Sequence, residues 1–107
     1  MMNLNAVSAR INVTDNDIAN GTQYIPGNCA IALALKRLGY ESPIVGPSNC
    51  YVMVNGAEME AVLPEEASAF VHAFDLSFLA MNPVPAPFEF ELAFVPAGPY
   101  RGEVYAS

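Results

Sequence analysis

The sequence predicts one α+β domain with a small, mainly antiparallel sheet of three or four strands and helices packed on one face. Three observations predict this class. Asn55-Gly56 separates two runs of alternating apolar and polar residues, which is the strongest short-range signal for a β-hairpin. Residues 29–38 are rich in Ala and Leu, which favour a helix. Residues 88–95 begin with apolar side chains alternating with Glu, as in a half-buried strand.

The length and composition fit one folded domain. The chain has 107 residues, of which 53% are hydrophobic and only 14% are charged, the opposite of a disordered protein. We expect a single domain over residues 1–107, with an ordered core over about 9–95 and a Pro/Gly-rich C-terminal tail over 96–107.

The N-terminal part predicts a strand and a short helix. Residues 9–14 alternate apolar and polar side chains, which indicates a half-buried strand. Thr14 and Asp17 have the spacing of a capping box, so a short helix is expected over Asp15–Asn20, ending at Gly21. A loop follows over residues 21–27.

The main helix is predicted over Cys29–Leu38. Asn28 is expected as its N-cap, and Gly39 lies where a glycine commonly ends a helix. The segment is apolar on nearly all sides, so we expect it to be largely covered. Residues 41–48 contain Pro43 and Pro47 and are expected to form a loop.

The C-terminal half predicts a hairpin, a helix and a last strand. The hairpin pairs Cys50–Val54 with Ala57–Leu63. Pro64 is expected at the first position of the next helix, whose buried stripe would be Ala67, Phe70, Val71 and Phe74. Residues 75–87 are expected to form a Pro-containing linker to the strand over 88–95.

The charge balance restricts the partners. The chain carries 11 acidic and 4 basic residues, a net charge of −7. This argues against direct binding to nucleic acid or to an anionic membrane, because both need clustered Lys and Arg. Residues 1–16 show no signal peptide, and no apolar run approaches the roughly 20 residues of a membrane span, so a cytoplasmic protein is expected.

Two strands each carry a pair of glutamates that point away from the core. A two-residue turn puts Glu58 and Glu60 on the outer face of the hairpin, and Glu89 and Glu91 on the outer face of the last strand. Each pair spans about 6.6 Å, close to the spacing of phosphates along a nucleic-acid strand. If the strands are neighbours, four carboxylates gather with no Lys or Arg among them. Ordinary solvation and edge protection explain the same pattern.

No residue pattern predicts an enzyme. Cys29 near a helix N-terminus and His72 could act as nucleophile and base, but a buried thiol and a histidine on the flank of a helix are the favoured interpretation. The two cysteines and one histidine lack chelating spacing, so we expect no metal, no cofactor and no catalytic residue.

The chain resembles a group of short phage-encoded proteins from accessory genes. The matching segments are Ile11–Thr14, Asp17-Ile18, Gly21, Cys29–Leu35, Leu63–Ala67, Phe70-Val71, Ala73–Asp75 and Pro87–Leu92. The resemblance implies a scaffold without a catalytic site. Small acidic proteins of this class are often inhibitors of host defence, notably anti-CRISPR proteins, and several of these imitate nucleic acid.

The resulting hypothesis is an anti-CRISPR protein in the host cytoplasm. It would bind the basic DNA-binding surface of a CRISPR effector and block target DNA. The partner-binding residues would be Glu58, Glu60, Glu89 and Glu91, helped by Glu65, Glu66 and Asp75. The alternatives are another anti-defence protein, which inhibits a nuclease or sequesters a signal nucleotide, and a housekeeping phage protein whose acidity serves solubility. The oligomeric state is left open.

Overall fold

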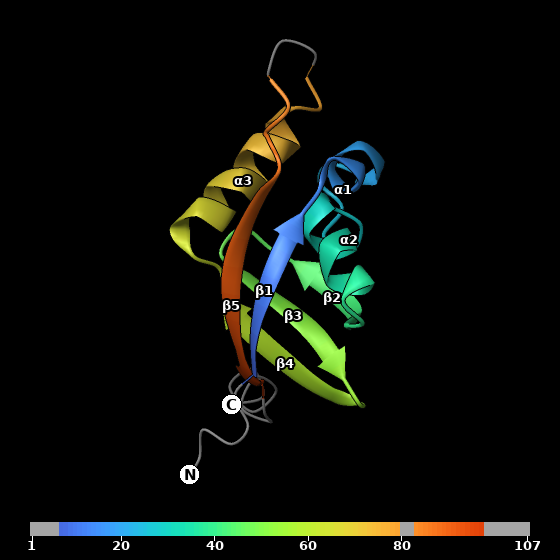
Figure 1. Ribbon diagram of the computed structural model, residues 1–107, viewed down its shortest axis with the longest axis vertical. Coiled ribbons are helices and arrows are strands. Elements are labelled where there is room, and N and C mark those ends of the chain that lie inside the picture. The colour runs from blue at the N-terminus through green and yellow to red at the C-terminus, as the bar shows by residue number, and fades with distance from the viewer. Residues whose placement is uncertain (1–6, 80–82, 98–107) are drawn as a thin grey trace, which may run out of the picture.

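The computed structural model describes residues 7–79 and 83–97. In chain order, its elements are β1 (Val7–Val13), α1 (Asp15–Asn20), α2 (Ala30–Arg37), β2 (Glu41–Val45), β3 (Asn49–Val54), β4 (Ala57–Val62), α3 (Glu65–Leu76) and β5 (Phe88–Pro96). The strands form one antiparallel sheet in the order β1-β5-β4-β3-β2 (Figure 1). The α+β class is confirmed, but the described sheet has five strands rather than the expected three or four.

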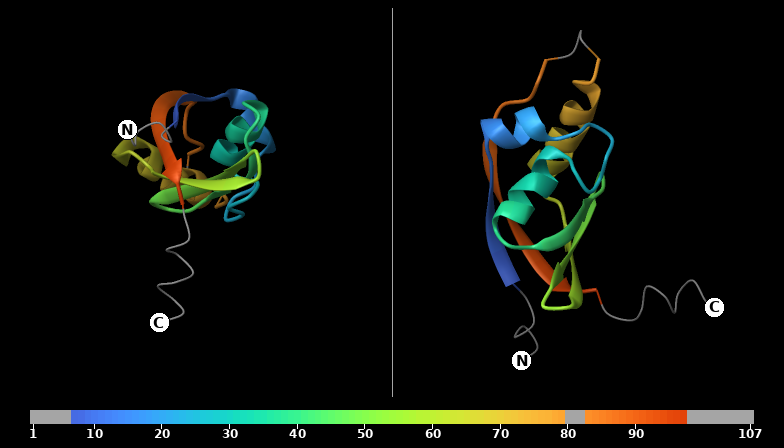
Figure 2. Two further views of the ribbon diagram at one scale, coloured as in Figure 1. Left: turned by 90° about the horizontal axis from the view of Figure 1, so that it is seen from below. Right: turned by 90° about the vertical axis from the view of Figure 1, so that its right-hand side faces the viewer.

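The sheet is curled, and the helices lie on its concave side (Figure 2). Helix α2 contacts both β1 and β2, which are the two edges of the sheet, so it covers the open side of the curl. Helix α3 packs through aromatic rings: the Phe70 centroid lies 6.0 Å from that of Phe74 and 4.7 Å from that of Phe88 on β5. None of the described helices therefore lies on the convex side of the sheet.

The hairpin has the register that the Asn-Gly turn predicts. Tyr51 pairs with Glu60 and Met53 pairs with Glu58. Asn55 and Gly56 have φ values of +51° and +84°, as a type I′ turn requires. Met59, between the two glutamates, is 7% exposed and faces the core, so the glutamates lie on the convex side.

Strand β2 replaces the loop expected over residues 41–48. A register shift between Glu41 and Ile44 interrupts its pairing with β3, and Ser42 adopts a φ of +51° there. Pro43, inside this irregularity, is fully buried. A proline is tolerated at a bulge on an edge strand, because no ladder hydrogen bond is needed from its nitrogen. The Pro and Gly content that predicts a loop is therefore compatible with a short, bent strand.

The ends of the helices differ slightly from the prediction. Thr14 and Asp17 form the expected capping box of α1. Cys29, rather than Asn28, is the N-cap of α2, because the Asn28 side chain donates a hydrogen bond to Thr22 Oγ1 at 2.9 Å and closes the loop instead. Pro64 is the N-cap of α3 rather than its first residue.

The expected linker and tail are described only in part. Helix α3 continues to Leu76, so the linker begins two residues later than residue 75, where it was expected. The last strand is confirmed, and at Phe88–Pro96 it runs one residue beyond the expected end at Val95, into the expected tail. Residues 80–82 of the linker and 98–107 of the tail lie outside the described residues.

Candidate functional site

The convex face of the hairpin carries one of the two expected pairs of glutamates. Glu58 and Glu60 on β4 are half-buried there, beside Tyr51 and Met53 on β3. We call these four residues the outer hairpin face. Neither β3 nor β4 contains a Lys or Arg. The two glutamates lie on a face of the sheet that none of the described helices covers.

Exposed apolar residues continue this face across the neighbouring strands. Ile44 on β2 pairs with Tyr51, and Val95 on β5 pairs with Glu60, so one row of side chains crosses four strands. Ile44 is 53% exposed, Val62 at the end of β4 is 73% exposed and Val95 is 45% exposed. Tyrosine, methionine and exposed aliphatic side chains are typical of protein–protein contact surfaces.

The second pair of glutamates has a cation beside it, contrary to the expectation from the sequence. Arg10 on β1 pairs directly with Glu91 on β5. Its Nε donates to Glu89 Oε1 at 3.0 Å, and its Nη1 donates to Glu91 Oε2 at 3.2 Å. The expectation of four carboxylates with no Lys or Arg among them is therefore wrong. The Arg10 charge offsets part of the negative potential of this pair.

The two pairs also lie apart along the sheet. Val95, the residue of β5 that pairs with Glu60, is four residues beyond Glu91. At the rise of a strand, four residues span about 13 Å, which exceeds the Debye length of about 8–10 Å under physiological conditions. The four glutamates thus form two separate pairs. Only Glu58 and Glu60 belong to the outer hairpin face.

The three remaining predicted site residues lie elsewhere on α3. Glu65 and Glu66 occupy its first turn, where acidic side chains stabilise the helix through its dipole. They follow β4 in the sequence after Leu63 and Pro64. Asp75 lies at the other end of α3, where its Oδ1 accepts a hydrogen bond from the Tyr24 backbone N–H at 2.9 Å. It belongs to a separate pocket.

The cations are unevenly distributed along the sequence. The sequence contains no Lys or Arg between Arg37 and Arg101. Strands β2 to β5 and α3 all lie within that interval and carry all seven acidic residues of the predicted site. Among the described residues, the cations are Arg10 on β1 and Lys36 and Arg37 on α2. Strands β3 and β4, which form the outer hairpin face, therefore together carry acidic residues but no Lys or Arg of their own.

Arg37 on α2 binds both to α1 and to the end of β1. Its Nη1 donates to Asp17 Oδ1 at 2.5 Å, and its Nη2 donates to the Asn12 carbonyl at 2.6 Å. Burial by itself would raise the pKa of Asp17, but hydrogen bonds from Arg37 and Thr14 outweigh it and lower that pKa below 3.8. Among the described cations, Arg10 and Arg37 are therefore both paired to carboxylates.

The thiols are buried. Cys50 is fully buried and Cys29 is 6% exposed. Burial raises the pKa of both, that of Cys50 to about 12, with a further contribution from Cys29. These thiols are mostly protonated at neutral pH, which disfavours a nucleophile. Cys29 lines a pocket with Asp75, and His72 is exposed outside that pocket.

Two further kinds of feature, metal sites and membrane-spanning helices, were sought within residues 7–79 and 83–97. These residues contain no group of three His, Cys, Asp or Glu side chains placed to hold a metal ion. No described helix is long and apolar enough to cross a membrane. In comparisons with known proteins, no family model, no curated protein and no solved structure matches the chain.

Sequence reasoning missed two features of this surface. Arg10 follows the alternation of its strand and faces outward, but nothing local predicts that β1 pairs with β5. Ile44 and Val95 each flank the hairpin from a different strand, one of which was expected to be a loop. Both features depend on strand order, which the sequence pattern does not specify.

Proposed function

We propose that this protein is an inhibitor that binds a basic surface of another protein through its outer hairpin face. The observation that carries the proposal is the composition of that face: Glu58 and Glu60 lie among Tyr51, Met53 and exposed aliphatic residues, on strands without a Lys or Arg. Negative charge steers a basic partner to the surface, and the apolar residues supply area that is buried on contact.

The class of partner follows from the sequence resemblance. Among short phage-encoded proteins, the hypothesis is an anti-CRISPR protein, and CRISPR effectors hold nucleic acid in positively charged channels. The outer hairpin face would occupy such a channel and exclude target DNA. Glu58 and Glu60 on one rigid strand stand about 6.6 Å apart, which suits the imitation of successive phosphates. Glu65 and Glu66, in the first turn of α3, add further negative charge to the protein.

The proposed role is binding, not catalysis. The buried thiols have raised pKa values, and the exposed His72 does not line the pocket that contains Cys29. The charge pattern supports a protein partner over a nucleic acid, because a chain with a net charge of −7 repels phosphates. The Arg10 bridge reduces the contribution expected from Glu89 and Glu91.

The test is protection of a targeted phage. The protein is expressed in strains that each carry one type of CRISPR system aimed at the same phage, and plaque formation is counted. The proposal expects plaques to be restored with at least one type. It also expects the purified effector of that type to bind the protein when free of target DNA and to lose that binding once target DNA is loaded.

The alternatives give different results in the same assay. Protection from a nuclease-based defence without protection from any CRISPR type would replace the proposal with inhibition of that nuclease. If no system is inhibited, and if replacing Glu58 and Glu60 by neutral residues lowers solubility, the favoured alternative is a housekeeping protein whose acidity serves solubility. Binding that is unaffected by saturating target DNA would contradict nucleic-acid mimicry.

A further inference from the structure

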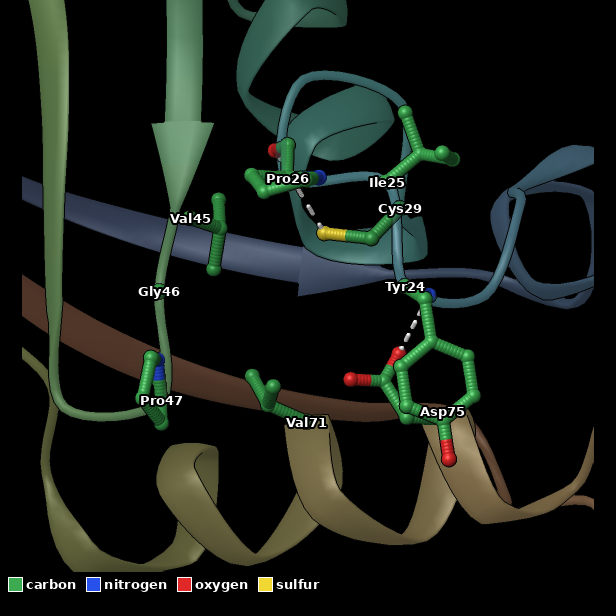
Figure 3. A pocket seen from close by; sticks show the side chains of 9 residues that line it. All are labelled: Tyr24, Ile25, Pro26, Cys29, Val45, Gly46, Pro47, Val71 and Asp75. Carbon is green, nitrogen blue, oxygen red and sulfur yellow. Dashed lines mark hydrogen bonds between the residues drawn. The ribbon is translucent and has the colours of Figure 1, made fainter.

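A second candidate contact site lies on the opposite side of the fold from the outer hairpin face. It is a pocket of about 210 Å³ between the loop that precedes α2, the end of β2 and the second half of α3 (Figure 3). Its walls are mainly apolar and include Ile25, Pro26, Val45, Pro47 and Val71. At one end of these walls lies a single charged side chain, that of Asp75.

Hydrogen bonds fix the loop that forms one wall of this pocket. The Val45 backbone N–H donates to the Pro26 carbonyl at 3.0 Å, which ties the loop to β2. Gln23 Nε2 donates to Ser77 Oγ at 3.1 Å, and the Tyr24 N–H donates to Asp75 Oδ1, which ties the loop to α3. The pocket is therefore held open by three separate segments and does not depend on one mobile side chain.

Tyr24 adopts a backbone conformation that non-glycine residues seldom keep. Its φ is +64°, in the left-handed region, which costs on the order of 1–2 kcal/mol for a residue with a side chain. This conformation directs its N–H to Asp75 and leaves the residue 60% exposed, with its ring in edge-to-face contact with Phe78. Backbone strain of this kind is concentrated at binding and functional sites.

The carboxylate of Asp75 is arranged to receive a cation. One oxygen accepts the Tyr24 hydrogen bond, and Figure 3 shows the other pointing away from it, into the space between Cys29 and Val71. No Lys or Arg of the described residues pairs with Asp75. The last turn of α3 contains no basic residue, so the negative end of the helix dipole adds to the charge.

We propose that this pocket binds the side chain of a lysine or arginine on a partner protein. Its aliphatic stem would lie against the apolar walls, and its charged head would pair with the free oxygen of Asp75. The exposed rings of Tyr24 and Phe78 beside the pocket offer further contact with the cation or with the partner's surface. The pocket shares no residue with the outer hairpin face, so this inference stands or fails separately from the proposed function.

The test uses the full chain, labelled at its methyl groups, and follows the NMR shifts of Ile25, Val45 and Val71. The probes are N-acetyl-lysine N-methylamide, the corresponding arginine compound and the uncharged norleucine compound. We expect both cationic probes to shift these methyl groups saturably. We expect norleucine to bind at least about fivefold more weakly, because it lacks the charge-assisted hydrogen bond.

The decisive variant is Asp75→Asn, which keeps an oxygen that can accept the Tyr24 hydrogen bond. It should weaken the lysine probe by about tenfold and leave norleucine unchanged. Asp15→Asn, which removes an exposed carboxylate from α1, is the matched control and should leave both affinities unchanged. Equal binding of lysine and norleucine, no effect of Asp75→Asn, or no shift with any probe would each overturn the proposal.

Discussion

Arg10 on β1 lies directly opposite Glu91 on β5, and its guanidinium reaches along the strand to bridge Glu91 and Glu89. This contact divides the acidic residues of the sheet into two kinds. The negative charge of the pair on β5 is partly offset by Arg10 of the neighbouring strand. The pair on β4, Glu58 and Glu60, lies on strands without a Lys or Arg.

Removal of the Arg10 side chain tests this division. Arg10→Gln should change the free energy of unfolding little, because the bridge is exposed and such ion pairs contribute little to stability. It should increase the negative potential of the sheet and so speed the association with a basic partner at low salt. Stopped-flow association rates at several salt concentrations measure this effect. An unchanged rate would mean that the β5 pair does not act on the partner even through its field.

The Asp17–Arg37 pair should make stability depend on pH in acid. Because the folded-state pKa of Asp17 is lowered, its contribution is present above the unfolded pKa of about 4 and is lost as the pH falls through the folded value. Asp17→Asn should therefore destabilise the protein at pH 7, by roughly 2 kcal/mol. It should also reduce the loss of stability below pH about 4. Urea unfolding of both proteins across this pH range measures the difference.

Gly21 is required by the close approach of α1 to the start of α2. A Cβ at this position would lie 2.7 Å from the Ala30 nitrogen and 2.9 Å from the Asp17 carbonyl oxygen, both backbone atoms. Gly21→Ala should cost roughly 1–3 kcal/mol, because the backbone must move to make room. Gly27→Ala is the control, since its nearest contact would be an ordinary 3.5 Å. Equal thermal stability of the two variants would contradict this packing.

The two thiols should react slowly in the folded protein. With Cys50 fully buried and its pKa raised to about 12, very little thiolate is present at neutral pH. Labelling with a thiol reagent at neutral pH should be at least about 100-fold slower in the native protein than in denaturant. Replacement of both cysteines by Ala should leave partner binding intact. Fast labelling of Cys29 in the native state would restore the interpretation of a reactive thiol.

Local signals predicted the parts of the fold that depend on neighbouring residues. The turn at Asn55-Gly56 specifies the hairpin register, and with it the outward positions of Glu58 and Glu60. The capping box of Thr14 and Asp17 likewise specifies the start of α1. In these cases the atoms that determine the structure are close in sequence, so residue type and spacing are sufficient.

The parts that were missed depend on contacts between distant residues. Pro43 indicates a loop by composition, but pairing with β3 makes its segment an edge strand. The Arg10 bridge requires β1 to pair with a strand that lies about eighty residues away. The pocket beside Asp75 requires three segments to meet, and no local pattern in any of them indicates a cavity. Strand order therefore limits what the sequence predicts about the site.

The most direct test of the central claim is the affinity for a CRISPR effector of two charge-matched variants, Glu58→Gln with Glu60→Gln and Glu89→Gln with Glu91→Gln. Each removes two negative charges from outward strand positions. The account predicts that the β4 variant loses at least about 100-fold in affinity, if two close charge pairs contribute about 1.5 kcal/mol each. It predicts that the β5 variant loses much less, and that wild-type binding weakens as salt rises. A folded β4 variant that binds as tightly as the wild type would contradict the account.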